Sequence, residues 1–176
     1  IRINADNIEA HREIAALYLK RNMVKEAEAH YLEVLRLKNT DNEARNALII
    51  ISVCKKDYDT LQKLLLEAAR LNPDDPDSYY RLGQLYEFKK NYDDALVQYK
   101  EATSIKSDHA KALNALGRVY MKTGRITEAK EALEQAKKAD PGLEETAVLL
   151  SSVRDELSPE PKKYHKHNKK AKKAKK

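Results

Sequence analysis

Several residue types that shape other protein classes are scarce in this sequence. Its 176 residues include one cysteine, four glycines and five prolines, and no tryptophan. Because Cys54 is the single cysteine, the chain cannot form an internal disulfide or a zinc site with several thiolate ligands. So few glycines and prolines also disfavour a fold of many strands joined by tight turns. A single cysteine is compatible with a reducing compartment, and we expect a cytoplasmic location.

Long apolar runs are absent as well. The longest covers residues 14–19, whereas a membrane-spanning helix needs about 20 apolar residues. Charged residues make up 35% of the chain and hydrophobic residues 41%, proportions that suit a helix-rich protein of one domain or one repeat array. We therefore expect no membrane span.

Basic residues are concentrated at one end. The formal net charge is +6, but residues 158–176 hold nine lysines and one glutamate, which leaves 25 basic and 27 acidic residues elsewhere. A segment with this charge, two prolines and little apolar surface is expected to be disordered. Such blocks often bind partners, here nucleic acid, an anionic membrane surface or an acidic protein, although a solubilising tail or a nuclear import signal fits too. The expected anion contacts are Lys162, Lys163, Lys166, Lys169, Lys170, Lys172 and Lys173.

A set of residues recurs at an interval of 34 positions. Four windows follow this interval without gaps, namely 8–41, 42–75, 76–109 and 110–143. The recurrence is clearest between the third and fourth windows, where Leu82, Gly83, Tyr86 and Ala95 return as Leu116, Gly117, Tyr120 and Ala129. A fixed period of this length indicates a repeat array. We expect residues 1–7 to be the end of a preceding repeat, and residues 144–157, apolar on one face only, to form a helix that caps the array.

Each window predicts two helices of about 14 residues with a short turn between them. In the fourth window, apolar residues follow helical spacing twice, with Gly124 between the two runs and Asp140-Pro141 after the second. Glycine can end a helix in the left-handed conformation, and proline stops one. Pro76 suits a first helical position. Side chains expected to cap first helices are Asn7, Asp41 and Asp75.

This pattern resembles the tetratricopeptide repeat family, whose signature over 34 residues contains Trp-x-x-Leu-Gly-x-x-Tyr, then Ala, Phe or Tyr, Ala and Pro. The resemblance covers residues 1–157 and implies an all-α, right-handed superhelical solenoid of helix-turn-helix repeats. The second window departs from it, since Ile49 stands where Gly or Ala is usual, Ser52 replaces Tyr and Leu61 replaces Ala. Bulk at both close-contact positions is expected to push the two helices of this repeat apart.

No catalytic arrangement emerges from the sequence. His11, His30 and His109 occupy different positions of the repeat, and His165 and His167 lie among lysines that disfavour a divalent cation. Cys54 has no His or Asp pattern that would activate it. The paired aspartates at 74–75 and 93–94 fit turns and helix caps. We therefore expect no enzyme activity, no catalytic residue, no cofactor and no metal site.

The resemblance implies a concave groove, lined by the first helix of each repeat, in which a peptide or helix of another protein binds. By position, the lining candidates are Arg12, Ala16, Leu19 and Lys20; Asn46, Ile50, Val53 and Cys54; Tyr80, Gln84, Glu87 and Phe88; and Lys111, Asn114, Arg118, Met121 and Lys122. An apolar stretch is expected from Leu19, Ile50, Val53 and Phe88, and a basic patch from Lys111, Asn114, Arg118 and Lys122, with Asn114 and Arg118 exposed. These features predict a partner that has an apolar anchor and an acidic segment.

Other interpretations of the chain remain open at this point. The lysine-rich segment could anchor an adaptor to RNA or to an anionic surface, and the N-terminal end of the array could mediate self-association. A chaperone-tail adaptor of the same family is disfavoured, because Ala16 stands where that subtype has Asn, and Asn46 and Ile50 depart from its pattern too.

Overall fold

The computed structural model describes residues 7–158 of the chain. The predictions made for residues 1–6 and 159–176, among them the anion contacts of the tail lysines, lie outside the described residues.

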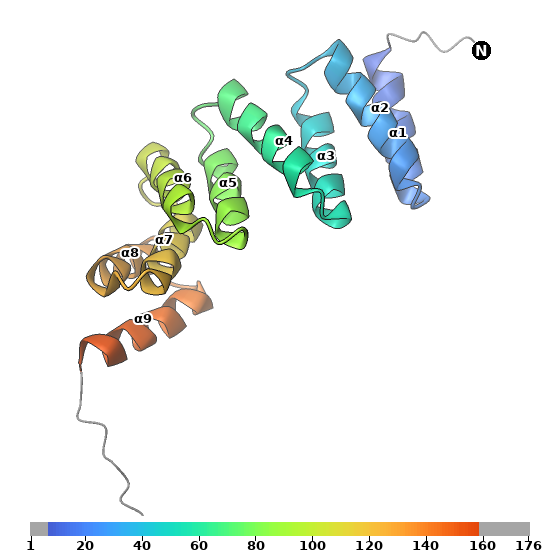
Figure 1. Cartoon of the computed structure of the whole chain (residues 1–176). Coiled ribbons are helices and arrows are strands. Elements are labelled where there is room, and N and C mark those ends of the chain that lie inside the picture. The colour runs from blue at the N-terminus through green and yellow to red at the C-terminus, as the bar shows by residue number, and fades with distance from the viewer. Residues whose placement is uncertain (1–6, 159–176) are drawn as a thin grey trace, which may run out of the picture.

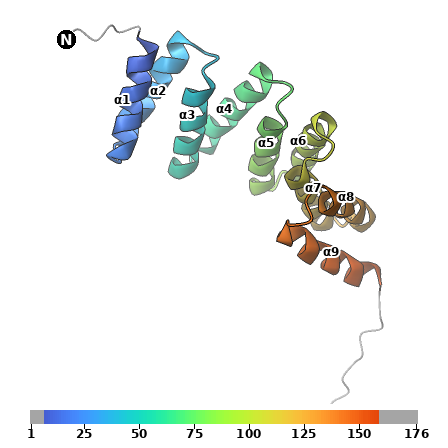
Figure 2. The ribbon, with the colours of Figure 1, turned by 180° about the vertical axis from the view of Figure 1, so that it is seen from behind.

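The described residues form an all-α array. Nine helices follow one another between residues 7 and 158: α1 (Ile8–Lys20), α2 (Val24–Leu37), α3 (Asn42–Lys55), α4 (Tyr58–Leu71), α5 (Pro76–Phe88), α6 (Tyr92–Ile105), α7 (Ala110–Lys122), α8 (Ile126–Ala139) and α9 (Glu144–Leu157). Consecutive helices pack in pairs, and the pairs stack into an arc that begins at α1 and ends at α9 (Figure 1). Figure 2 shows the same arc from behind. None of the helices in this part of the chain has the length and apolarity needed to cross a membrane.

The predicted N-terminal caps are confirmed. Side-chain oxygens of Asn7, Asp41 and Asp75 accept backbone N–H groups at the starts of α1, α3 and α5, at 3.1, 3.0 and 3.2 Å. These bonds satisfy donors that the first turn of a helix leaves without partners. His109 does the same for α7, where its Nδ1 accepts the N–H of Ala112 at 3.1 Å. Gly124, with φ of +74°, follows the end of α7 as predicted.

Small residues set the closest approach of paired helices in the last two repeats. A methyl group at Gly83 would overlap the ring of Tyr99, and one at Gly117 would overlap Leu133. Their partners Ala95 and Ala129 are fully buried on the facing helices. Because each pair is in close contact, the buried apolar side chains of α6–α9 form one continuous core, and Tyr80 and Tyr86 of α5 pack against it.

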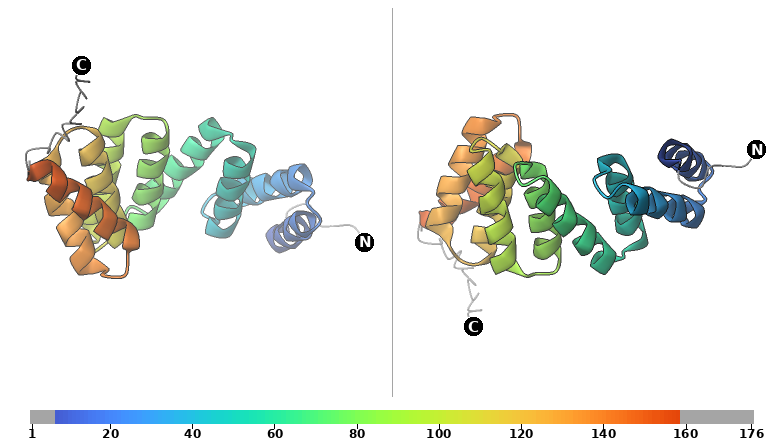
Figure 3. Two further views of the ribbon diagram at one scale, coloured as in Figure 1. Left: turned by 90° about the horizontal axis from the view of Figure 1, so that it is seen from below. Right: turned by 90° about the horizontal axis from the view of Figure 1, so that it is seen from above.

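The second repeat is more open, as its sequence predicts. Helices α3 and α4 contact one another less extensively than the paired helices of the other repeats. Ile49 and Leu61 stand at the two close-contact positions and are both buried. They pack in a separate cluster that reaches forward to Leu82 and Leu85 of α5. Side chains of the next repeat therefore fill part of the space between α3 and α4. Figure 3 shows this middle part of the array joining the two ends.

Candidate functional site

A cavity lies between α3 and α5, two helices on the inner side of the arc (Figure 1). We call it the apolar groove; its volume is about 680 Å³ and its lining residues are Asn46, Ile49, Ile50, Val53, Cys54, Tyr58, Leu61, Leu65, Arg81, Gln84, Leu85 and Phe88. Side chains from α3 and α5 form its walls, and those of α4 form its floor. This size falls in the range of typical ligand pockets.

The bulky residues of the second repeat explain why the groove is here. Ile49 and Leu61 keep α3 and α4 from meeting closely, so the floor reaches down to α4. On the walls, Ile50 and Phe88 are each 63% exposed, although both are large apolar side chains. The ring of Phe88 lies 4.8 Å from that of Tyr58, measured between centroids. The groove therefore presents apolar side chains to solvent at the place where the repeat geometry is irregular.

The predicted apolar stretch lies largely together in the structure. Ile50, Val53 and Phe88 all line the groove, and Cys54 lies beside them with an exposed thiol. Leu19 is exposed on α1 but does not line the groove.

The groove has an apolar end, formed by Ile50, Val53 and Phe88, and a polar end opposite to it. Arg81 donates from Nη1 to Oδ1 of Asn46 at 3.2 Å, which joins α5 to α3. Gln84, also a lining residue, donates to the hydroxyl of Tyr80 at 2.9 Å. Tyr80 itself is half-buried against the rings of Tyr99 and His109.

Sequence reasoning missed part of this lining. Arg81 was not among the candidates, nor were the floor residues Tyr58, Leu61 and Leu65. A signal for Arg81 was available: it precedes Gln84 by three residues and Phe88 by seven, and such positions share one face of a helix. The floor residues could not be found this way, because they lie on α4 and border the groove only where α3 and α4 separate.

The predicted basic patch is compensated by carboxylates. Glu87, with 9% of its side chain exposed, accepts from Arg118 Nε and Nη2 at 2.9 Å each, from Lys122 Nζ at 2.8 Å and from the Tyr99 hydroxyl at 2.9 Å. Burial opposes ionisation of this carboxyl, but the hydrogen bonds from Arg118 and Lys122 outweigh it and lower its pKa to about 2. We call this set, with Glu145, the Glu87 network.

Helix α9 supplies the remaining partners of the Glu87 network. The expected exposure of Asn114 and Arg118 is therefore wrong. Asn114 was expected to be exposed, but only 2% of it is accessible. Its side chain donates to Glu145 at 2.7 Å and accepts from Thr146 at 2.9 Å. Arg118, expected to be exposed as well, is partly covered, and its Nη1 donates to the same Glu145 at 2.7 Å. The expectation failed because α9 packs against α7 and α8 and supplies Glu145 and Thr146 as partners.

The remaining candidates are divided between paired and exposed positions. Arg12 forms ion pairs with Asp41, Glu43 and Glu9 at 3.0–3.4 Å, so its charge is compensated within α1 and α3. Lys111 is exposed on α7. Met121 packs against the core of the C-terminal repeats. Ala16 and Lys20 lie on α1, away from the apolar groove.

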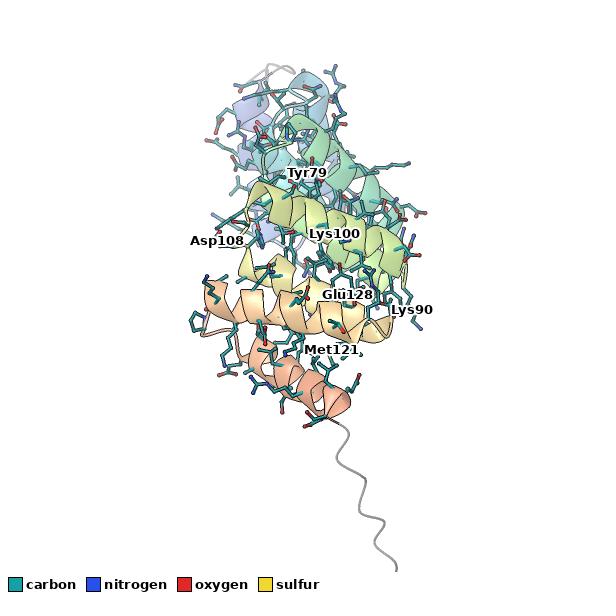
Figure 4. All side chains as sticks on the ribbon, turned by 90° about the vertical axis from the view of Figure 1, so that its left-hand side faces the viewer. Tyr79, Lys90, Lys100, Asp108, Met121 and Glu128 are labelled. Atoms are coloured by element: carbon teal, nitrogen blue, oxygen red, sulfur yellow. The ribbon has the colours of Figure 1, made fainter. Side chains whose placement is uncertain are left out.

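Polar and charged side chains elsewhere serve structure. Asp77 holds His109 at 3.1 Å, and His11 and His30 contact each other through their Nδ1 atoms at 2.8 Å. The outer surface is charged, as illustrated by Lys100 of α6 and Glu128 of α8 (Figure 4). Among residues 7–158, no three His, Cys, Asp or Glu side chains gather closely enough to hold a metal ion.

Comparisons with known proteins agree with this architecture. Two family models, each described as tetratricopeptide repeat, match residues 64–97 and 89–148. No curated protein matches the sequence.

Solved structures with the same fold come from several proteins. MamA from Desulfovibrio magneticus RS-1 is similar with a TM-score of 0.73 at 21% identity, over 89% of this chain and 88% of that one. YrrB, titled a tetratricopeptide repeat protein with an unusual peptide-binding site, gives 0.69 at 19% identity over 88% and 79%. PilF of Pseudomonas aeruginosa gives 0.69 at 16% identity over 85% and 68%.

Identities this low show the fold alone, and the family models add the repeat signature. Proteins of this kind are typically scaffolds for protein–protein interaction. The helix pairs, the 34-residue period and both family matches lead to one conclusion: the chain belongs to the tetratricopeptide repeat family.

Proposed function

We propose that this chain is a non-catalytic scaffold whose apolar groove binds a segment of another protein. The observation that carries the proposal is the groove itself, about 680 Å³ of largely apolar cavity open on the inner side of the array. YrrB, of the same fold, is described as having an unusual peptide-binding site. The family to which the chain belongs typically serves as such a scaffold.

Burial of the exposed wall residues supplies the driving force. Covering the exposed 63% of Phe88 or of Ile50 stabilises a complex by roughly 1–2 kcal/mol, in proportion to the apolar area removed from water. Aromatic side chains in the centre of a contact commonly carry much of the binding energy. A partner that inserts a large apolar side chain between α3 and α5 would cover Ile50, Val53 and Phe88 together.

Site-specific photo-crosslinking tests the proposal directly. Benzoylphenylalanine would replace Phe88 in one variant and Val97 in another, expressed in the native source. Val97 is a matched control because it is 58% exposed on α6 and does not line the groove. We expect a protein crosslinked at position 88, absent at position 97 and lost when Ile50→Asp is added to the first variant. The same crosslinks at both positions, or none at 88, would overturn the proposal.

A second candidate function rests on the lysines of residues 158–176. This segment would anchor the chain to RNA or to an anionic surface. Binding through many lysines releases counterions and falls steeply as salt rises, whereas insertion of an apolar side chain falls less. Retention of the whole chain and of a chain ending at residue 157, on RNA and on anionic vesicles at two salt concentrations, separates the two functions. Equal retention of both chains would exclude the anchor.

A further inference from the structure

We propose that the segment bound in the apolar groove carries a carboxylate near its apolar anchor, and that Arg81 binds this carboxylate. The inference rests on the proposed function, because it concerns the same groove. It specifies the chemistry of the partner and the residue that selects it.

The lining of the groove carries one charge, which is positive. Of the twelve lining residues, Arg81 alone is charged, and none is acidic. Its guanidinium lies at the polar end beside Asn46 and Gln84, whereas Phe88, Ile50 and Val53 form the apolar end. A positive charge on the rim of an otherwise neutral, apolar site favours a ligand with one negative charge.

The guanidinium of Arg81 is bonded to a neutral group and has no carboxylate partner among residues 7–158. A guanidinium has five N–H donors, and its planar fork matches a carboxylate. Arg81 donates from Nη1 alone, and the acceptor is the neutral amide of Asn46. Asp77, one helical turn earlier, is within ion-pair distance of His109 instead. Within residues 7–158, no carboxylate forms an ion pair with Arg81.

Other cations on the inner side fit this role less well. Arg12 is paired with Asp41 and Glu43, and Arg118 and Lys122 are paired within the Glu87 network. An acidic ligand at Arg118 would have to displace Glu87 or Glu145. The acidic contact expected for the fourth repeat is therefore assigned to Arg81 in the third. Lys111 forms no ion pair with another residue of 7–158 either, but it lies on α7 and outside the groove lining.

The helix geometry sets the spacing on the partner. Arg81 and Phe88 are seven residues apart on α5, which corresponds to about 10 Å along the helix axis at 1.5 Å per residue. An extended segment covers this distance in about three residues at roughly 3.3 Å each. We therefore expect an acidic residue about three positions from the apolar anchor.

Four short peptides test the inference. Two contain one Phe and one Asp three positions apart, acetyl-DAAFAA-amide and acetyl-AAFAAD-amide, and two carry Asn in place of Asp. Binding to the full chain would be followed by methyl NMR of Ile50 and Val53. We expect at least one Asp peptide to bind roughly fivefold more tightly than its Asn counterpart, the effect of a charge-assisted pair at a partly exposed site.

Two variants assign the preference to a residue. Arg81→Gln keeps a donor for Asn46 but removes the charge, and we expect it to bind the Asp and Asn peptides equally. Lys111→Gln removes another exposed charge and should leave the preference unchanged. Thermal unfolding checks that both variants are folded.

The outcomes separate this inference from the proposed function. If all four peptides bind the unmodified chain equally and shift Ile50 and Val53, the groove is a binding site and Arg81 does not select the carboxylate. Loss of the preference in Lys111→Gln, with its retention in Arg81→Gln, overturns the inference in the same way. If no peptide shifts the groove methyls up to its solubility limit, the proposed function fails, and the inference fails with it.

Discussion

The second repeat and the last two repeats have the same helix-turn-helix architecture, but their paired helices pack at different closeness. In the last two, Gly83 and Gly117 let paired helices meet so closely that a methyl group would not fit. At the equivalent position, the second repeat has Ile49, and its helices meet less extensively. One region is filled by its own core, and the other leaves a groove of about 680 Å³.

The polar groups of the C-terminal region and of the groove differ as well. The C-terminal region is joined across α5, α6, α7 and α9 by the Glu87 network, in which each charged group has a partner of opposite charge. At the groove, Arg81 is bound to a neutral amide and large apolar side chains face solvent. Polar groups with all their partners and a closed core favour rigidity. Exposed apolar side chains and a charge without a counter-charge favour binding of a partner. On the function proposed above, one end of the array would serve as a platform and the middle as the binding surface.

The largest effect is expected from Gly117→Val. The added side chain would overlap Leu133, which is fully buried, so the neighbouring side chains would have to shift. Overpacking of a closed core costs about 1–3 kcal/mol, and we expect the upper end of that range. Urea unfolding with hydrogen exchange of α7 and α8 measures it. The matched control is Ile49→Val at the equivalent position, expected to cost about 1 kcal/mol. Equal losses at the two positions would contradict the contrast between the repeats.

Glu87→Gln is expected to follow in size. It removes the carboxylate shared by Tyr99, Arg118 and Lys122, and we expect a loss of about 2 kcal/mol at neutral pH. The folded-state pKa of Glu87 is lowered from 4.5 to about 2. Its stabilising contribution is therefore present above pH 4.5 and is lost as the pH falls toward 2.

Urea midpoints measured against pH test this prediction. The unmodified chain and Glu87→Gln should differ at pH 7 and converge near pH 2. Glu145→Gln serves as a control with a smaller loss, because about half of that side chain is exposed. A difference that stays constant over this range of pH would show that the carboxylate charge is not the cause.

Asn114→Ala is expected to loosen α9. The change leaves Thr146 without its acceptor and Glu145 without one donor, which costs about 1–2 kcal/mol for buried groups. Faster hydrogen exchange in α9 than in α5 would show that the effect is local. Ser151→Ala, on an exposed position of the same helix, should change neither. Uniformly faster exchange over the whole array would contradict a role limited to α9.

Phe88→Ala should have the smallest effect on stability and a clear effect on binding. The side chain is 63% exposed, so we expect the free energy of unfolding to change by less than about 0.5 kcal/mol. Binding of the phenylalanine peptides should weaken severalfold, since one wall of the groove is lost. Val97→Ala is the matched control and should change neither quantity. Unchanged peptide binding in Phe88→Ala would place the binding surface elsewhere.

The sequence by itself determined the repeat architecture. A period of 34 residues, helical spacing of apolar residues, and caps such as Asn7, Asp41 and Asp75 are local properties, and each is readable without knowledge of neighbours. It also located the opening of the second repeat, because Ile49 and Leu61 replace small residues at known contact positions.

Only the tertiary structure decided which polar residues are available to a partner. Position on a helix face identified Arg118 and Asn114 as groove residues but could not show that Glu87, on another repeat, and Glu145, on α9, hold them. Nor could it show that Arg81 is paired with a neutral amide or that Tyr58, Leu61 and Leu65 form a floor. The physical reason is that periodicity fixes the direction of a side chain, whereas its partners come from helices about 30 residues away whose separation depends on how the repeats pack.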